Sequence, residues 1–153
     1  MSANASNKVV LASDHAGLTL KNQLVDYLRS KNFQVTDLGT HTTDSVDYPD
    51  YAAEVSRHIL DHKSDLGILV CGTGVGMCIT ANKFHGIRAA VVSEPFSAQM
   101  SREHNNANVL CLGARVIDLQ KAHEIVDTWL NATFQAGRHE NRLQKIKKIE
   151  EIG

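Results

Sequence analysis

The stretch from Val70 to Gly76 joins a thiol to three closely spaced glycines, and it is the part of the chain best suited to chemistry. Cys71 ends an apolar run, and the glycines precede a short segment that is predicted to be helical. Because glycine has no Cβ, a ligand can approach the backbone of such a loop closely. The unpaired N–H groups at a helix start favour anions and thiolates. The stretch therefore predicts a base beside a cradle for negative charge.

Apolar runs typical of strands alternate with segments of helical periodicity along the chain. The predicted strands cover Lys8–Ser13, Gln34–Leu38, Leu66–Val70, Ile87–Val92 and Val109–Leu112. The predicted helices cover residues 17–30, 49–62, 77–83 and 95–104, a long segment capped by Asp118, and a last segment from about Arg138 that carries Leu143, Ile146, Ile149 and Ile152. This alternation predicts one three-layer α/β/α Rossmann-like domain with a five-stranded parallel sheet.

In an open parallel sheet, ligands bind beyond the carboxyl ends of the strands. Polar residues follow four of the predicted strands at this edge: Asp14 with His15, Cys71 with Thr73, Ser93 with Glu94, and Arg115. We therefore expect these side chains to face a common site. The order of the strands does not follow from the sequence.

The chain of 153 residues is predicted to form a single domain over residues 8–153, with residues 1–7 as a disordered N-terminal tail. The net charge of −1 gives no reason to expect a nucleic acid or a membrane as partner. The three cysteines show no disulfide framework, which favours free thiols and a cytoplasmic location. No apolar stretch approaches the ~18 residues of a membrane span, and the first residues lack the apolar core of a signal peptide.

Six motifs, in this order, resemble type B ribose-5-phosphate isomerases, a family that also includes galactose-6-phosphate and allose-6-phosphate isomerases. The resemblance runs from about Lys8 to about Ile149. The motifs are Ser13–Gly17, Asp47–Pro49, Cys71–Gly76, Ala81–Lys83, Ser101–Asn106 and Gly137–His139.

The resemblance implies an enzyme that interconverts a phosphorylated aldose and ketose through an enediolate, without metal or other cofactor. Carried over by position, Cys71 is the base, and Thr73 holds the enediolate oxygen together with the backbone of Gly72, Gly74, Val75 and Gly76. His104 assists opening of the sugar ring. The implied sugar contacts are Asp14, His15 and Asn105, and the implied phosphate contacts are Arg115, Arg138 and Arg142. Some relatives place a glutamate base where Met77 stands and lack the thiol, so this chain resembles the cysteine group.

The family also implies a homodimer with shared active sites, with a tetramer as the alternative. The predicted partner is a small sugar phosphate, and ribose 5-phosphate with ribulose 5-phosphate is the pair that we expect. A six-carbon sugar phosphate stays open, because no motif measures the depth of the pocket.

Several of these residues also have structural interpretations. Cys71 could be a buried thiol, and Asp14 could cap a helix. Arg138 and Arg142, four residues apart, could form the solvated face of a helix. Tyr48 could pack against the protein or cover the sugar. His58 and His62 share a helical spacing, but no third ligand supports a metal site.

Two other classes of function compete with the isomerase. The spacing of Gly72, Gly74 and Glu94 resembles a dinucleotide-binding fingerprint, but Met77 occupies the third glycine position and the loop follows the third strand instead of the first. A non-catalytic sugar-phosphate sensor, or one subunit of a heteromeric isomerase, is the other alternative. The thiol, the histidine and the arginines together favour a self-sufficient enzyme.

Overall fold

The computed structural model of the protein describes residues 7–153. Residues 1–6 of the predicted tail lie outside the described residues. The remaining tail residue, Asn7, accepts a hydrogen bond at its carbonyl oxygen from the Gln34 N–H at 2.8 Å. Asn7 thus continues the pairing of the first two strands.

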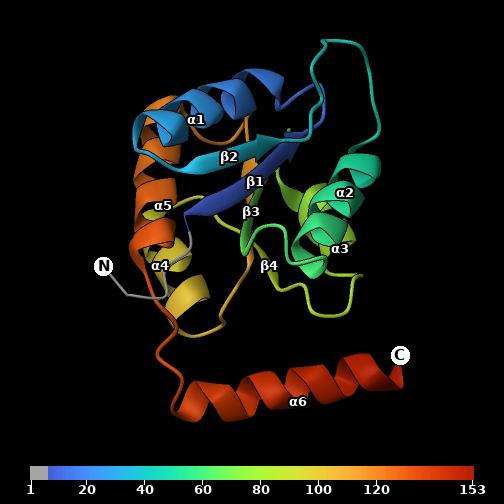
Figure 1. Ribbon diagram of the computed structural model, residues 1–153, viewed down its shortest axis with the longest axis vertical. Helices are drawn as coiled ribbons and strands as arrows, with labels where there is room; N and C mark the ends of the chain where they lie inside the picture. Colours follow the sequence, from blue (N-terminus) through green and yellow to red (C-terminus); the bar gives the residue numbers. More distant parts are fainter. Residues whose placement is uncertain (1–6) are drawn as a thin grey trace.

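Strands and helices alternate through the first five units of the chain, and a sixth helix follows (Figure 1). The strands are β1 (Lys8–Ser13), β2 (Gln34–Asp37), β3 (Leu66–Cys71), β4 (Ala89–Val91) and β5 (Val109–Gly113). The helices are α1 (Leu18–Ser30), α2 (Tyr48–Leu60), α3 (Val75–Ala81), α4 (Pro95–Glu103), α5 (Leu119–Asn131) and α6 (Arg138–Ile152). The expected α/β fold class is confirmed.

The five strands form one parallel sheet in the order β2-β1-β3-β5-β4. β5 inserts between β3 and β4, so the loops after β1, β3 and β5 are neighbours at one edge of the sheet. The pairing of Cys71 with Gly113 brings the ends of β3 and β5 side by side. This order places the thiol between two other strand ends that carry polar residues.

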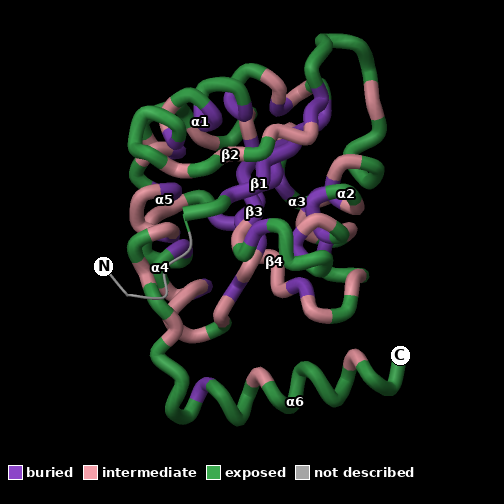
Figure 2. The backbone as a smooth tube through the Cα atoms, viewed as in Figure 1, coloured by how far each residue is buried: buried purple, intermediate pink, exposed green. Residues whose placement is uncertain are grey.

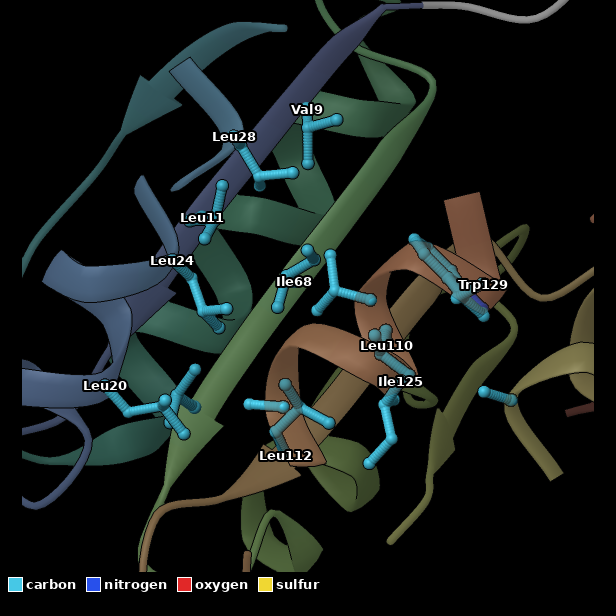
Figure 3. Close-up of a cluster of buried hydrophobic side chains, with 14 of the residues drawn as sticks. Val9, Leu11, Leu20, Leu24, Leu28, Ile68, Leu110, Leu112, Ile125 and Trp129 are labelled. Atoms are coloured by element: carbon cyan, nitrogen blue, oxygen red, sulfur yellow. The ribbon is translucent and has the colours of Figure 1, made fainter. Parts of the chain in front are cut away.

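Helices cover both faces of the sheet and bury its side chains in two clusters. On one face, α1, α4 and α5 pack over the sheet around residues such as Leu24, Ile68 and Trp129 (Figure 3). On the other face, α2 and α3 pack over Val10, Leu69 and Cys111. Each strand can contribute side chains to both clusters, because successive side chains of a strand point to opposite faces of the sheet.

Side-chain caps mark the starts of two helices, α4 and α5. Asp118 accepts a hydrogen bond from the Lys121 N–H at 2.8 Å and caps α5, as predicted. Glu94 accepts from the Ser97 N–H and caps α4. A hydrogen bond with the Ser97 side chain is the main cause that lowers the pKa of Glu94, and the bond from the Ser97 backbone lowers it further. Asp47 stands at the N-cap of α2, with proline in the first turn, but its side chain makes no capping bond.

Most predicted boundaries differ from the observed ones by only one or two residues, and the differences at α3 and β4 have a clear cause. α3 begins at Val75 instead of residue 77, since Gly74 adopts the left-handed conformation that starts the helix earlier. β4 is limited to Ala89–Val91, because Ile87 belongs to a turn in which its N–H bonds the Phe84 carbonyl.

Helix α6 stands apart from the layered domain (Figure 1) and is exposed along most of its length (Figure 2). Three apolar side chains of α6 are exposed: Ile146 by 45%, Ile149 by 68% and Ile152 by 86%. Within the described residues, no helix is long and apolar enough to cross a membrane.

Candidate active site

The carboxyl edge of the sheet brings three strand ends together around the thiol. The backbone pairing continues one step beyond the strands: the Asp14 N–H bonds the Val70 carbonyl at 3.2 Å, and the Ala114 N–H bonds the Cys71 carbonyl at 2.8 Å. The Arg115 N–H bonds the Gly72 carbonyl at 3.0 Å. These bonds fix the segments after β1, β3 and β5 relative to one another.

Cys71 is 5% exposed, and its Sγ accepts a hydrogen bond from the Gly74 N–H at 3.1 Å. Gly74 has a φ of 82°, a left-handed conformation that side chains rarely adopt. The chain can therefore turn back so that its amide points at the sulfur. The loop amide therefore holds the sulfur in a fixed position at the end of β3.

Thr73 is held beside the thiol by its own loop. Its Oγ1 accepts a hydrogen bond from the Val75 N–H at 3.2 Å. A hydroxyl that accepts such a bond still has its proton to donate. Thr73 can therefore donate to an oxygen of a bound ligand.

Glycines let other parts of the chain approach this loop closely. A Cβ on Gly113 would lie 2.6 Å from the Thr73 carbonyl oxygen, and a Cβ on Gly76 would lie 2.4 Å from the Tyr48 ring. A Cβ on Gly72 would lie 3.0 Å from the Arg115 Nη1. We call residues 72–76, which follow Cys71, the thiol loop. Arg115 and Tyr48, which is 40% exposed, therefore both lie against the thiol loop.

Asp14 and His15 are fixed by hydrogen bonds at the same edge. Asp14 is buried, and its Oδ1 accepts from the Gly17 N–H at 3.0 Å, which orders the turn before α1. The Nδ1 of His15 accepts from the Val46 N–H at 3.1 Å. In a neutral ring this places the proton on Nε2, which can then donate to a ligand. We call Asp14, His15, Cys71, Thr73 and Arg115 the thiol half-site.

The remaining predicted residues lie at the opposite, amino-terminal edge of the sheet. His104 is the C-cap of α4, and Asn105 follows in the loop that leads into β5. The ring of His104 stacks on His139 of α6 with centroids 4.1 Å apart. Arg138 and Arg142 lie on the same helix. We call His104, Asn105, His139, Arg138 and Arg142 the histidine half-site.

Charge and burial favour the neutral form of the His139 ring. Burial lowers its pKa most, and the positive charges of His104, Arg138 and Arg142 lower it further. The stack therefore joins two imidazole rings in a positively charged region, which is suited to an anion such as a phosphate.

One chain does not bring the two half-sites together. β3 spans six residues, so at about 3.3 Å per residue the two edges of the sheet lie roughly 17 Å apart. This separation exceeds the length of a five-carbon sugar phosphate.

A cavity of about 500 Å³ lies at the amino-terminal edge and is lined by Arg88, Arg102 and Asn106, but not by Cys71. A second cavity of about 510 Å³ separates α6 from the loop at Gly86. Within residues 7–153, no group of three or more histidine, cysteine, aspartate or glutamate side chains could hold a metal ion.

Two residues that matter for this geometry carry no predicted role: His139 and Gly113. The sequence shows Gly137–His139 as a motif, but nothing in the helical pattern pairs His139 with His104. The close approach of Gly113 to Thr73 depends on two strands that are not consecutive in the chain.

The fold and the thiol half-site define an α/β protein with a thiol, a hydroxyl and a guanidinium group gathered at the carboxyl edge of a parallel sheet. The family model of the Ribose/Galactose Isomerases matches residues 9–146. The chain therefore belongs to the Ribose/Galactose Isomerase family.

Individual relatives resemble the chain over nearly its whole length. Ribose-5-phosphate isomerase B of Escherichia coli is 48% identical over 144 residues, which cover 94% of this chain and 97% of that protein. The structure of Clostridium thermocellum ribose-5-phosphate isomerase B is 50% identical, with a TM-score of 0.94 over 95% of this chain and 98% of that one. Mycoplasma genitalium ribose-5-phosphate isomerase B, with bound ribulose-5-phosphate, is 44% identical, with a TM-score of 0.91 over 95% of this chain and 97% of that one.

Proposed function

We propose that the chain is a ribose-5-phosphate isomerase, which interconverts ribose 5-phosphate and ribulose 5-phosphate with Cys71 as base. Its relatives include proteins named for this activity and one structure that contains ribulose-5-phosphate. The observation that carries the role of Cys71 is the Gly74 N–H directed at its sulfur. Cytoplasmic location is part of the proposal, because three cysteines without a disulfide framework suit a reducing compartment.

The thiol half-site supplies the parts of an enediolate mechanism. The Cys71 thiolate removes the proton from C2 of the open-chain aldose and returns it to C1 of the enediolate. The Thr73 hydroxyl and the loop amides donate to the oxygen that becomes negative. Loss of one such donor typically costs ~2.7–4 kcal/mol of transition-state stabilisation.

The histidine half-site serves ring opening and phosphate binding. His104 transfers a proton to the ring oxygen, and Asn105 contacts the sugar. Arg138 and Arg142 are four residues apart on α6, so they share a face that can grip phosphate oxygens. A firmly held phosphate positions the reacting carbons. Binding energy from the phosphate, which is remote from those carbons, then increases the rate of the reaction.

The two half-sites form one active site only if a second chain contributes one of them. We therefore infer a homodimer in which the thiol half-site of one chain faces the histidine half-site of its partner. The exposed Ile146, Ile149 and Ile152 give α6 an apolar surface suited to such a contact. A twofold axis then creates two equivalent sites for each dimer.

The first experiment tests substrate and base together. We expect turnover of ribose 5-phosphate to exceed that of allose 6-phosphate and galactose 6-phosphate when all three are assayed side by side. Cys71→Ala should lower kcat by about 10²–10⁴-fold and still bind ribose 5-phosphate in a thermal-shift assay. Full activity of this variant would remove Cys71 as the base, and a preference for a six-carbon substrate would overturn the assignment of the sugar.

The second experiment tests whether the site is shared. Cys71→Ala and His104→Ala are each expected to be inactive alone. Random re-pairing of equal amounts places one intact site in every mixed dimer, so about a quarter of the wild-type activity should return. Mixing two preparations of Cys71→Ala is the matched control. No recovery, with mixed dimers verified by mass spectrometry, would show that the site belongs to one chain.

A further inference from the structure

One fully buried charged side chain, Lys21, has no part in the proposed mechanism. It lies in the first turn of α1, and its Nζ donates to both carboxylate oxygens of Asp37, at 2.8 and 2.9 Å, and to the side-chain oxygen of Asn22 at 2.9 Å. A lysine is almost never fully buried unless it is paired. The pair links the start of α1 to the end of β2, next to the segment between β1 and α1 that carries Asp14 and His15.

Stability alone does not account for a buried ion pair. Both charges lose hydration on burial, and apolar side chains of similar volume often leave a protein equally stable or make it more stable. The Asp37 carboxylate has a second contact that an apolar side chain cannot make, because its Oδ1 also accepts the Gly39 N–H at 3.0 Å. Lys21 therefore holds a carboxylate that fixes the backbone at Gly39.

The backbone at Gly39 in turn fixes the end of β1. The Ser13 N–H donates to the Gly39 carbonyl at 2.7 Å, and the Thr40 N–H donates to the Ser13 carbonyl at 2.9 Å. Ser13 and Thr40 are both buried. Because Asp14 and His15 follow Ser13 directly, a displacement of Gly39 moves the backbone that carries them.

The same segment reaches His15 by a second route. Residues 41–45, which follow Thr40, are exposed and extend beyond the end of β2 (Figure 1). At the far end of this loop, the Val46 N–H donates to the His15 Nδ1 at 3.1 Å. His15 thus closes a ring of covalent and hydrogen bonds that the buried ion pair anchors to the domain.

We propose that Lys21 is a positioning residue of the isomerase site, a role that rests on the proposed function. Through Asp37 and the Gly39 backbone, it fixes Asp14 and keeps the His15 ring in the orientation in which Nε2–H can donate to the sugar. The three donors of its ammonium group already have acceptors within the protein, so Lys21 acts on the sugar only through the residues that it holds. Loss of the ammonium group frees the carboxylate to turn toward water, and the segment at Gly39 then loosens together with the loop.

The first measurement follows the tautomer of His15 and does not depend on activity. The ¹⁵N chemical shifts of an imidazole ring distinguish a proton on Nδ1 from one on Nε2, and the His15 signals are identified by their loss in His15→Gln. At about pH 8, where imidazole side chains are ordinarily neutral, we expect the Nε2–H tautomer in the wild type. In Lys21→Met, which keeps an unbranched side chain and removes the charge, we expect shifts intermediate between the two tautomers.

Leu28→Ala is the matched control for a loss of stability. Leu28 is equally buried on the same helix, in the core cluster of Figure 3, and lies about 10 Å from Lys21 along the helix axis. The substitution leaves a cavity and should lower the urea midpoint of unfolding, but it leaves the ion pair in place. We therefore expect wild-type His15 shifts in Leu28→Ala. Unchanged His15 shifts in folded Lys21→Met, or the same change in Leu28→Ala, would overturn the proposal.

The second measurement is steady-state kinetics on ribose 5-phosphate, under conditions in which circular dichroism shows each variant to be folded. Misplacement by 1 Å can cost about 10²-fold in rate, so a partial displacement of the sugar contacts should lower kcat/KM of Lys21→Met about tenfold. Leu28→Ala should keep the kcat/KM of the wild type. A wild-type kcat/KM in Lys21→Met would refute the role in the reaction.

The two measurements separate this proposal from the proposed function. A wild-type protein that does not isomerise ribose 5-phosphate would refute the function, whereas the His15 shifts would still show whether Lys21 holds that ring. Asp37→Asn removes the ion pair from its other side with almost no change in shape. It replaces Lys21→Met if that variant does not fold, and we expect the same shifts and the same loss of kcat/KM from it.

Discussion

Gly113→Ala probes how tightly the sheet supports the thiol loop. The added Cβ would lie 2.6 Å from the Thr73 carbonyl oxygen, 2.7 Å from its carbonyl carbon and 2.8 Å from its Cα. All three atoms are backbone, so no side chain can rotate away to relieve the contact. Gly113 has no left-handed φ, and the effect of the methyl group is therefore one of space alone.

The size of the displacement follows from these distances. Real Cβ atoms essentially never approach another atom closer than 3.0 Å, so Thr73 must move by at least about 0.4 Å. Overpacking of this kind typically costs about 1–3 kcal/mol of unfolding free energy. If a shift of 1 Å costs about 10²-fold, a shift of this size lowers kcat about fivefold to tenfold.

The assay combines steady-state kinetics on ribose 5-phosphate with urea unfolding. Gly153→Ala is the matched control, since its Cβ would meet only the Glu150 carbonyl oxygen at 3.7 Å, an ordinary contact. We expect the control to match the wild type in both measurements. Unchanged kcat and unfolding free energy in Gly113→Ala would show that the loop yields freely, and the argument from close packing would fail.

Three further predictions concern stability, pH and phosphate binding. Asp37→Ala leaves the Lys21 ammonium buried without the carboxylate that it contacts at 2.8 Å, so we expect the free energy of unfolding in urea to fall by about 3–5 kcal/mol. The control is Glu124→Ala, which removes an exposed ion pair and should lower the free energy of unfolding by at most about 1 kcal/mol. Burial and nearby charges lower the pKa of His139 below 6.5, so the unfolded chain binds this proton more tightly than the folded protein does. The free energy of unfolding should therefore fall as pH drops through 6.5. His139→Asn should flatten that dependence in unfolding measurements from pH 7.5 to 5.5, and an identical slope would contradict the assignment. Arg142→Ala should raise KM for ribose 5-phosphate several-fold more than Lys148→Ala on the same helix, and equal KM values would make Arg142 surface charge only.

Much of the fold follows from local patterns in the sequence. The alternation of apolar runs and helical segments predicts the strands and helices within a few residues, because strand burial and helix amphipathicity leave different periods. Asp118 and Glu94 mark helix starts through bonds made within three residues. The boundaries of α3 and β4 differ because Gly74 and the turn at Ile87 act through backbone conformation, which the apolar pattern does not encode.

The thiol half-site was also accessible to sequence reasoning, because its members follow the ends of predicted parallel strands. To know that these residues lie close together, one also needs the strand order, in which β5 separates β3 from β4.

The sequence by itself therefore indicated the kind of chemistry that we propose, through the types and spacing of Cys71, Thr73 and the glycines around them. Tertiary structure decided where the other predicted residues lie. The two edges of a parallel sheet are separated by the length of its strands. Helix α4 returns across the sheet from one edge to the other and so places His104 at the edge opposite the thiol. No spacing along a chain reveals this separation, because it depends on the direction in which each helix returns across the sheet.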